Sequence, residues 1–289
     1  MTWIAYTWGA VAQAAISKRF RLSLYLTGYL VLFLIELCTI LVNEYNDYET
    51  DRLNANFSMF TGGTRVIVEG GLSFREVKSG IWFVLLLLVG FSYLLNLLTP
   101  FNAQISLPLL IIIGLFLGLG YTIPPFKFSY RGLGEIVVSI THSIYVILCG
   151  FVFQGGMWDN PRPWVMSVPM FFSIFAAITL AGIPDRQADE AVRKKTVAVI
   201  FGPRRALMTA ISCVGLAYLS AFLCWYYQAM TVSMGFFTLL VLPHGTILVF
   251  YLVALLQKRK FERKINREMG LSLAYIIWFG LLPLLSLWR

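Results

Sequence analysis

Long runs of hydrophobic residues, separated by short polar segments, recur along the whole chain. Nine of these runs reach or approach the roughly 20 residues that an α-helix needs to cross a membrane. They cover residues 3–17, 22–46, 79–99, 104–122, 133–155, 164–184, 205–228, 233–256 and 271–288. Glycines and prolines fall between several runs and mark the turns. The pattern predicts an all-α integral membrane protein of about nine transmembrane helices, folded as a single domain over residues 1–289.

The composition agrees with this pattern. Of the 289 residues, 58% are hydrophobic and only 13% are charged, about half the charged fraction of a soluble domain. Nothing near the start resembles the processing site of a cleavable signal peptide, so we expect the spanning segments themselves to direct insertion. All four cysteines fall inside hydrophobic runs without the spacing of metal ligands. They are predicted to be buried, reduced packing residues.

Basic residues are distributed unevenly between the segments that connect the runs. The segments after the second, fourth, sixth and eighth runs hold 18 of the 23 Lys and Arg residues. The positive-inside rule then places these segments and the N-terminus in the cytoplasm. Topology therefore accounts for much of the net charge of +9 without nucleic acid as a partner. The run KRKFERKINR at 258–267 is predicted to anchor the protein to anionic lipid.

Two acidic stretches follow hydrophobic runs on the same predicted side of the membrane. In NEYNDYETD, directly after the second run, Asn43, Asp47 and Asp51 are four residues apart and share one helix face. In AGIPDRQADEAVRKKT, Asp185 and Asp189 repeat this spacing. Carboxylates repel one another and are unfavourable at a helix C-terminus, so a cation should compensate them. Two such helix ends facing each other predict a Mg²⁺ site, and solvated helix ends are the alternative.

Basic and flexible segments accompany both acidic stretches. TGGTRVIVEGG offers Arg65, YTIPPFKFSYRG offers Tyr121, Lys127 and Arg131, and RKKT offers Arg193, Lys194 and Lys195. A carboxylate–Mg²⁺ cluster ringed by Arg and Lys suits a diphosphate, because metal and cations together neutralise its charge. For each basic residue, the alternative is that it serves membrane topology alone.

The two acidic motifs resemble those of the UbiA superfamily of intramembrane prenyltransferases. The family motifs N-D-x-x-D-x-x-x-D and D-x-x-x-D are matched by Asn43, Glu44, Asp47 and Asp51, and by Asp185 and Asp189. Glu44 stands where the family usually has Asp, which leaves its role as a direct ligand open. YTIPPFKFSYRGLGE and RKKTVAVIFG are similar to the branch that prenylates dihydroxynaphthoate in menaquinone synthesis. The resemblance implies nine helices around a central cavity, capped by the cytoplasmic loops after the second and sixth helices.

The resemblance also implies a reaction and a set of site residues. Mg²⁺ would be held by Asn43, Asp47, Asp51, Asp185 and Asp189, the four aspartates and Lys127 would be catalytic, and the substrate would be bound by Asn43, Arg65, Tyr121, Arg131, Lys194 and Lys195. The donor would be an allylic prenyl diphosphate, and the acceptor a hydroxylated naphthoate or similar aromatic quinone precursor. A hydrophobic cavity would exclude water from the allyl cation, and aromatic side chains would face it.

Ionisable residues within the runs are candidates for contacts with the aromatic acceptor. Glu36 lies seven residues before Asn43 on nearly the same helix face, and an ionisable group at this depth suggests function. Glu135, at the start of the fifth run, and His142, further along the same run, are also predicted to contact the acceptor. The alternatives are a protonated structural glutamate at 36, a helix N-terminal role for Glu135 and interhelical hydrogen bonding by His142.

Three other functions remain open. A membrane terpene cyclase shares both motifs and needs no acceptor, and a lipid-forming relative prenylates a glycerol phosphate. A transporter would show internal repeats and broken helices near mid-membrane, whereas these charges cluster at one face. The prediction is an aromatic prenyltransferase of a bacterial or archaeal cell membrane with its site facing the cytoplasm. The acceptor, the prenyl chain length and the oligomeric state are left open.

Overall fold

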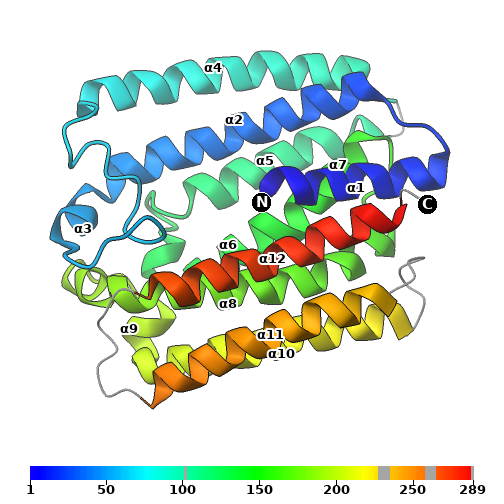
Figure 1. Cartoon of the computed structure of the whole chain (residues 1–289). Helices are drawn as coiled ribbons and strands as arrows, with labels where there is room; N and C mark the ends of the chain where they lie inside the picture. The colour runs from blue at the N-terminus through cyan, green and yellow to red at the C-terminus, as the bar shows by residue number, and fades with distance from the viewer. Residues whose placement is uncertain (101–102, 227–234, 258–264, 288–289) are drawn as a thin grey trace.

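The computed structural model describes residues 1–100, 103–226, 235–257 and 265–287. Within these residues the regular structure is helical, and the long helices lie side by side in one bundle (Figure 1). The elements are α1 (Thr2–Ser17), α2 (Leu22–Asn46), α3 (Tyr48–Leu53), α4 (Phe74–Leu98), α5 (Ser106–Leu119), η2 (Phe128–Tyr130), α6 (Gly134–Ile140), η3 (Thr141–Tyr145), α7 (Val146–Phe153), α8 (Pro161–Ala191), α9 (Val197–Phe201), α10 (Pro203–Tyr226), α11 (Gly235–Leu256) and α12 (Asn266–Leu287). The all-α prediction is confirmed for the described residues.

Each of the nine predicted runs coincides with a long helical segment, because α6, η3 and α7 follow one another as a single rod. Among the described residues, five segments are long and hydrophobic enough to cross a membrane: α2, α4, α6 to α7, α8 and α10. The count of nine crossings therefore stays a prediction. The run ends at 227–228, 233–234 and 288 lie outside the described residues, as do most of the basic run at 258–267 and Arg289.

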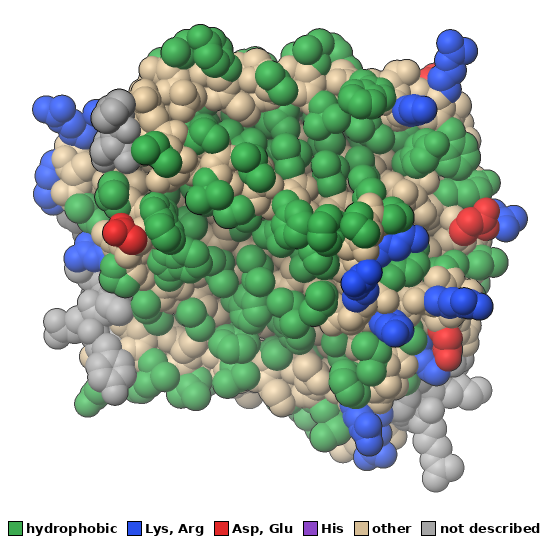
Figure 2. All heavy atoms as spheres, turned by 180° about the vertical axis from the view of Figure 1, so that it is seen from behind, with side chains coloured by type: hydrophobic (Ala, Val, Ile, Leu, Met, Phe, Trp, Pro, Cys, Tyr) green, Lys and Arg blue, Asp and Glu red, His purple; other side chains and the backbone are tan. Residues whose placement is uncertain are grey.

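The outer surface of the bundle is hydrophobic over most of its length. On α4, Trp82, Phe83, Leu86, Val89 and Tyr93 are each at least 60% exposed. Figure 2 shows a broad belt of hydrophobic side chains across one face, with the charged side chains gathered toward its two ends. Such a surface is compatible with lipid and unfavourable in water, which supports an integral membrane protein.

Close backbone packing joins α1 to α7 in the interior. A Cβ atom on Gly9 would lie 2.0 Å from the carbonyl oxygen of Ile147, and one on Gly150 would lie 2.1 Å from that of Tyr6. Helices in membranes associate largely by van der Waals packing, and small residues permit this approach. The four cysteines are buried and unpaired, as predicted.

The loops at one end of the bundle carry the polar motifs. The segment from α3 to α4, the segment from α5 to α6 and the segment around α9 all lie at the left-hand end in Figure 1. α3 packs against the end of α8, which is the longest helix of the described chain. The two acidic stretches are therefore neighbours in space although more than a hundred residues separate them in sequence.

Replacement of Gly150 by alanine is expected to destabilise the folded protein by about 1–3 kcal/mol, because the new methyl group would overlap the Tyr6 carbonyl. Gly215→Ala in α10 is the matched control, since a Cβ there meets nothing within 4 Å. The measurement is the thermal unfolding temperature of both variants in one detergent. Equal unfolding temperatures would contradict the tight contact between α1 and α7.

Candidate functional site

The first acidic stretch continues the helical register of α2. The helix ends at Asn46, and α3 begins at Tyr48 after a break at Asp47. Across the break, the Asp47 N–H donates to the Asn43 carbonyl at 2.7 Å, and the Asp51 N–H donates to the Asp47 carbonyl at 2.9 Å. Bonds between residues four apart keep their side chains on one face. Asn43, Asp47 and Asp51 accordingly line the same cavity, as their spacing predicts.

The second acidic stretch forms another wall of this cavity. Asp185 directly follows Pro184, and Asp189 lies one turn later, near the end of α8. Asn54, which follows α3, donates its side-chain amide to Asp185 Oδ1 at 2.7 Å. This bond ties the segment after α3 directly to α8.

The chain reverses after α8 and places Lys194 among the carboxylates. Arg193 adopts the left-handed conformation with a φ of 63°. The N–H of Lys194 donates to the Asp189 carbonyl at 2.8 Å, which is the Schellman type of helix end. The buried Lys194 ammonium then lies 2.9 Å from Asp47 Oδ2. One ion pair thus connects the ends of α2 and α8.

These residues line a polar cavity of about 250 Å³. The other residues that line it are Ile40, Glu44, Thr50, Asn54, Gly62, Gly63, Thr64 and Tyr121. Gly63 has a φ of 72°, and a Cβ atom there would lie 2.6 Å from Asp51 Oδ2. Only glycine allows the backbone to adopt this conformation and approach the carboxylate so closely.

A second, mostly hydrophobic cavity of about 290 Å³ adjoins the polar one. Ile40, Asn43 and Tyr121 line both cavities and form their common boundary. The walls of the hydrophobic cavity come mainly from α2, α5, α6 and η3, and they include Glu36 and His142. Two of the predicted acceptor residues therefore share one cavity with Asn43.

His142 lies on η3, a π-helical turn within the rod from α6 to α7. Its Nδ1 atom is 3.1 Å from the Val138 carbonyl oxygen and 3.0 Å from Thr141 Oγ1. Single π-helical turns inserted in helices are frequent at functional sites, because they change the direction of the side chains that they carry. Here the turn carries His142 and Tyr145 along the wall of the hydrophobic cavity.

Burial and like charge shape the ionisation of the polar cavity. Burial raises the pKa of Asp51 to about 7, and the neighbouring Asp47 carboxylate adds to the rise. Burial alone would lower the pKa of Lys194, but the Asp47 and Asp189 carboxylates raise it well above its usual value. Lys194 therefore stays charged. The polar cavity holds more carboxylates than the single Lys194 cation, so it favours the binding of an additional cation.

The donor set fits a divalent cation that also binds substrate oxygens. Asp47 Oδ1 is buried and has no hydrogen-bond partner within the described chain. No three His, Cys, Asp or Glu side chains among the described residues converge on one metal position. Mg²⁺ is usually bound by one or two carboxylates and completes its coordination with water and phosphate oxygens. The arrangement thus fits Mg²⁺ shared with a diphosphate better than a closed protein cage.

Two of the predicted site residues form contacts outside both cavities. Arg65 donates to the backbone carbonyl of Asp51, and its guanidinium carbon lies 4.0 Å from the centroid of the Phe57 ring. Glu135 Oε1 accepts the N–H of Val197 at 2.7 Å, at the start of α9. The first residue supports the main chain beside the carboxylates, and the second holds α9 to α6.

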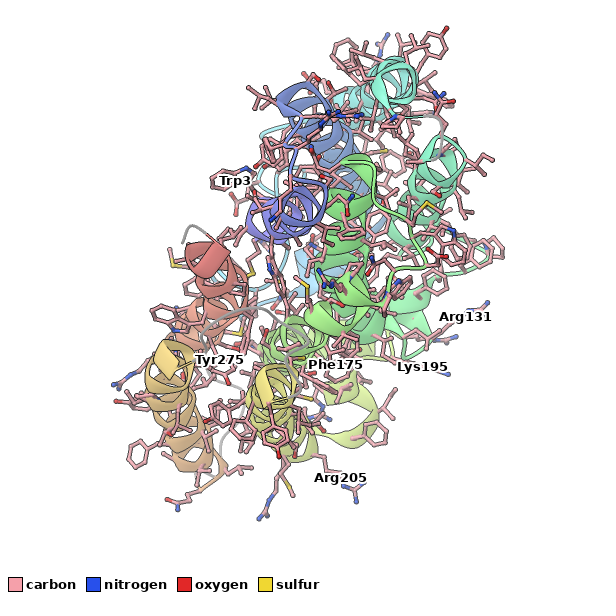
Figure 3. All side chains as sticks on the ribbon, turned by 90° about the vertical axis from the view of Figure 1, so that its right-hand side faces the viewer. Trp3, Arg131, Phe175, Lys195, Arg205 and Tyr275 are labelled. Atoms are coloured by element: carbon pink, nitrogen blue, oxygen red, sulfur yellow. The ribbon has the colours of Figure 1, made fainter. Side chains whose placement is uncertain are left out.

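Three predicted basic residues also line neither cavity. The Nζ atom of Lys127 lies 4.6 Å from the centroid of the Tyr130 ring. Arg131 and Lys195 are exposed, and Figure 3 shows both at the outer edge of the bundle. Arg131 donates to the Pro125 carbonyl at 2.7 Å. Of the predicted basic residues, Lys194 is the one that lines the polar cavity.

Sequence reasoning missed three polar partners, namely Asn54, Thr122 and Tyr130. The Thr122 hydroxyl donates to Asn43 Oδ1 at 2.9 Å and so orients this amide. Tyr130 has the ammonium groups of Lys127 and Lys194 at 4.6 and 5.6 Å from its ring centroid. Both residues belong to YTIPPFKFSYRG, but no spacing or charge distinguishes them there.

Known proteins resemble this chain in sequence and in fold. The sequence matches the UbiA prenyltransferase family over residues 2–281. It is 25% identical over 185 residues to the 1,4-dihydroxy-2-naphthoate octaprenyltransferase of Bacillus subtilis (strain 168), a match that covers 64% of this chain and 57% of that enzyme. The match thus spans little more than half the length of that relative.

Solved structures share the fold. An apo UbiA homolog from Aeropyrum pernix K1 has a TM-score of 0.68 at 17% identity, over 96% of this chain and 95% of that one. A UbiA homolog from Archaeoglobus fulgidus, bound to DMAPP and Mg²⁺, has a TM-score of 0.62 at 16% identity, over 96% and 94% of the two chains. Because the family match covers nearly the whole chain and the fold agrees with it, this chain belongs to the UbiA prenyltransferase family.

Proposed function

We propose that this enzyme transfers an isoprenyl chain from an allylic prenyl diphosphate to an aromatic acceptor, a hydroxylated naphthoate or similar quinone precursor, with Mg²⁺. The main support is the pair of adjoining cavities, one rich in carboxylates and one hydrophobic. A prenyl diphosphate has the same two-part character, with a charged head and a hydrophobic chain. The naphthoate octaprenyltransferase relative supports the class of acceptor, and the homolog bound to DMAPP and Mg²⁺ supports the donor and the metal.

The diphosphate is proposed to occupy the polar cavity. The residues that would hold Mg²⁺ there are Asn43, Asp47, Asp51, Asp185 and Asp189. One or two of these carboxylates would bind the ion directly, and the others would balance its charge. When bound, the metal supplies Lewis-acid stabilisation of the charge that grows on the leaving diphosphate. Lys194 can exchange Asp47 for a phosphate oxygen, since both are anionic oxygens within reach of the cavity. Lys127 would add positive charge beside the Tyr130 ring, which the Lys194 ammonium also approaches.

The bond that breaks is proposed to lie at the boundary of the two cavities. Tyr121 lines both of them, so its ring can face an allyl cation that forms there. On the hydrophobic side, Leu32, Ile35 and Val138 line the cavity and exclude the water that would quench this cation. The diphosphate, which takes both electrons of the broken carbon–oxygen bond, would remain in the polar cavity beside Lys194.

The acceptor ring is proposed to lie in the hydrophobic cavity beside Glu36 and His142. Glu36 Oε1 accepts a hydrogen bond from the Thr2 hydroxyl at 3.2 Å, which leaves its second oxygen for a hydroxyl of the acceptor. When His142 donates from Nδ1 to the Val138 carbonyl, the neutral imidazole presents Nε2 as a hydrogen-bond acceptor. The distribution of Lys and Arg supports a site that opens toward the cytoplasm.

Asp189→Asn and Asp47→Asn are each expected to lower the rate of diphosphate release at least about 100-fold at moderate Mg²⁺, which corresponds to about 2.7 kcal/mol of transition-state stabilisation. The matched control is Glu190→Gln, which removes an exposed carboxylate that pairs with Arg186. Thermal unfolding in detergent would establish that each variant is folded. Near-normal turnover by folded Asp189→Asn would contradict a metal site shared by both acidic stretches.

Lys194→Gln is expected to affect metal and substrate in opposite directions. Loss of the ammonium that pairs with Asp47 should strengthen Mg²⁺ binding to the substrate-free enzyme. Loss of a charged phosphate contact should raise KM for the prenyl diphosphate about tenfold. Calorimetry measures the first quantity and diphosphate release the second. Arg205→Gln, at an exposed cation of α10, is the control, and weaker Mg²⁺ binding by Lys194→Gln would refute this arrangement.

An acceptor assay separates aromatic prenyl transfer from terpene cyclisation. We expect Mg²⁺-dependent diphosphate release to rise steeply when dihydroxynaphthoate is added, because the acceptor fills the hydrophobic cavity and captures the cation. Diphosphate release and mass spectrometry of the lipid extract are measured with and without this compound. Full-rate release from the isoprenoid alone, with a cyclised product, would support the cyclase and exclude the transferase.

A further inference from the structure

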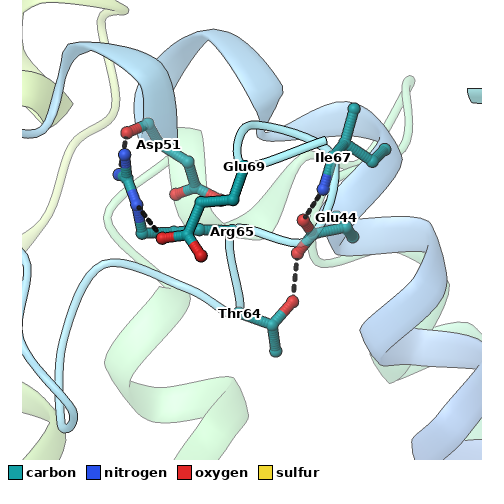
Figure 4. A network of polar contacts seen from close by, with 6 residues as sticks. All are labelled: Glu44, Asp51, Thr64, Arg65, Ile67 and Glu69. Atoms are coloured by element: carbon teal, nitrogen blue, oxygen red, sulfur yellow. Dashed lines mark hydrogen bonds and ion pairs between the residues drawn. The ribbon is translucent and has the colours of Figure 1, made fainter. Parts of the chain in front are cut away.

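Glu44 belongs to the first acidic stretch, but its carboxylate is occupied by the protein itself. The side chain is only 7% exposed. Oε1 accepts the backbone N–H of Ile67 at 2.9 Å, and Oε2 accepts the hydroxyl of Thr64 (Figure 4). Glu44 follows Asn43 by one residue, which turns it about 100° around the helix from the face that Asn43, Asp47 and Asp51 share. Glu44 therefore borders the polar cavity, but both of its bonds are made to the segment 64–67.

The segment that Glu44 binds continues a wall of the polar cavity. Gly62, Gly63 and Thr64 line this cavity, and the backbone of Gly63 packs directly against the Asp51 carboxylate. The next residue, Arg65, has a φ of 58° and donates to the Asp51 carbonyl. Figure 4 shows Glu44 and Asp51 as the two attachment points of this segment on the first acidic stretch.

Attachment is needed because the backbone of this segment is unfavourable by itself. The left-handed conformation is unfavourable for a residue other than glycine, because its Cβ atom crowds the backbone. The contacts of Arg65 with Asp51, with Phe57 and with the partly solvated Glu69 carboxylate at 3.5 Å offset part of this cost. The two bonds of Glu44 hold the residues on either side of Arg65, and a carboxylate makes such bonds stronger than a neutral acceptor would.

We propose that Glu44 is a positioning residue and not a metal ligand: it holds residues 64–67 so that Gly62 and Gly63 close the polar cavity beside Asp51. The proposal rests on the proposed function in so far as this cavity receives the diphosphate. The length of the side chain is essential. An aspartate would fall short by one carbon–carbon bond, about 1.5 Å, and could not reach both donors without movement of the segment.

Two conservative substitutions separate positioning from metal binding. Glu44→Gln keeps the length, since its amide oxygen can accept the Ile67 N–H while its amide nitrogen donates to the Thr64 oxygen. Glu44→Asp keeps the charge but loses the reach. A positioning role requires Gln to be the milder change, whereas a metal ligand requires Asp to be the milder change. Glu49→Gln, at an exposed carboxylate of the same stretch that pairs with Arg52, is the matched control.

The first measurement is hydrogen exchange of the Ile67 amide in the full-length protein in lipid nanodiscs, without Mg²⁺ or substrate. We expect at least a tenfold faster exchange in Glu44→Asp, and exchange within threefold of the parent in Glu44→Gln and Glu49→Gln. Thr64→Val removes one donor and should increase the exchange rate by an intermediate amount. In the double variant Glu44→Asp, Thr64→Val, the increase should be smaller than the two separate effects combined. This readout does not involve catalysis, so it remains decisive if the proposed function is wrong.

The second measurement is the dependence of diphosphate release on prenyl diphosphate and on Mg²⁺. We expect Glu44→Asp to raise KM for the prenyl diphosphate about tenfold, and Glu44→Gln to keep both KM and the half-saturating Mg²⁺ concentration within threefold of the parent. The proposal would be overturned if the Ile67 amide exchanged at the same rate in Glu44→Asp and Glu44→Gln, whether that rate equals the parent's or exceeds it in both variants. A tenfold rise in half-saturating Mg²⁺ for Glu44→Gln would instead identify Glu44 as a metal ligand.

Discussion

The ion pair between Lys194 and Asp47 is the interaction around which the substrate-free site is arranged. It joins the end of α8 to the end of α2, and both partners are largely withdrawn from solvent. Burial of two charges is repaid only when their geometry is close and other bonds support it. Here the reversal at Arg193, the bond from the Lys194 N–H to Asp189 and the nearby Tyr130 ring fix the ammonium in place. Segments from α2, α8 and the loop that carries Tyr130 therefore meet at the Lys194 ammonium.

The buried carboxylates of this end divide according to the donors that reach them. Glu44 and Glu135 are held by backbone N–H groups and stabilise the segments that carry these donors. Asp185 is held on one oxygen by Asn54. Asp47 retains an oxygen without a partner in the described chain, and burial leaves the Asp51 carboxyl with a pKa of about 7. Residue type alone does not assign these roles, because each role depends on the hydrogen-bond donor that reaches the carboxylate.

The sequence predicts the structural features that follow from hydrophobic periodicity and residue spacing. Hydrophobic runs predict the helices closely, and the four-residue spacing of Asn43, Asp47 and Asp51 places them on one wall because helical bonds continue across Asp47. The roles of Arg65 and Glu135 were not derivable in this way. Arg65 depends on a left-handed backbone, and Glu135 on the position of α9, a helix distant in sequence. Neither feature leaves a periodic signal, and Asn54 or Thr122 look like ordinary loop residues until their partners are known.

The boundary between the polar and the hydrophobic cavity matches the needs of the proposed reaction. On the proposed function, scission of the carbon–oxygen bond of an allylic diphosphate creates a carbocation and a diphosphate that gains one negative charge, and the two require opposite surroundings. Carboxylates, metal and Lys194 suit the first, whereas a dry wall with an aromatic face suits the second. Asn43 and Tyr121 line both cavities, so the change of environment takes place within the width of one side chain. A site at the end of a hydrophobic bundle suits both requirements, because the polar cavity is lined by helix ends and loops whereas the hydrophobic cavity is lined mainly by helices.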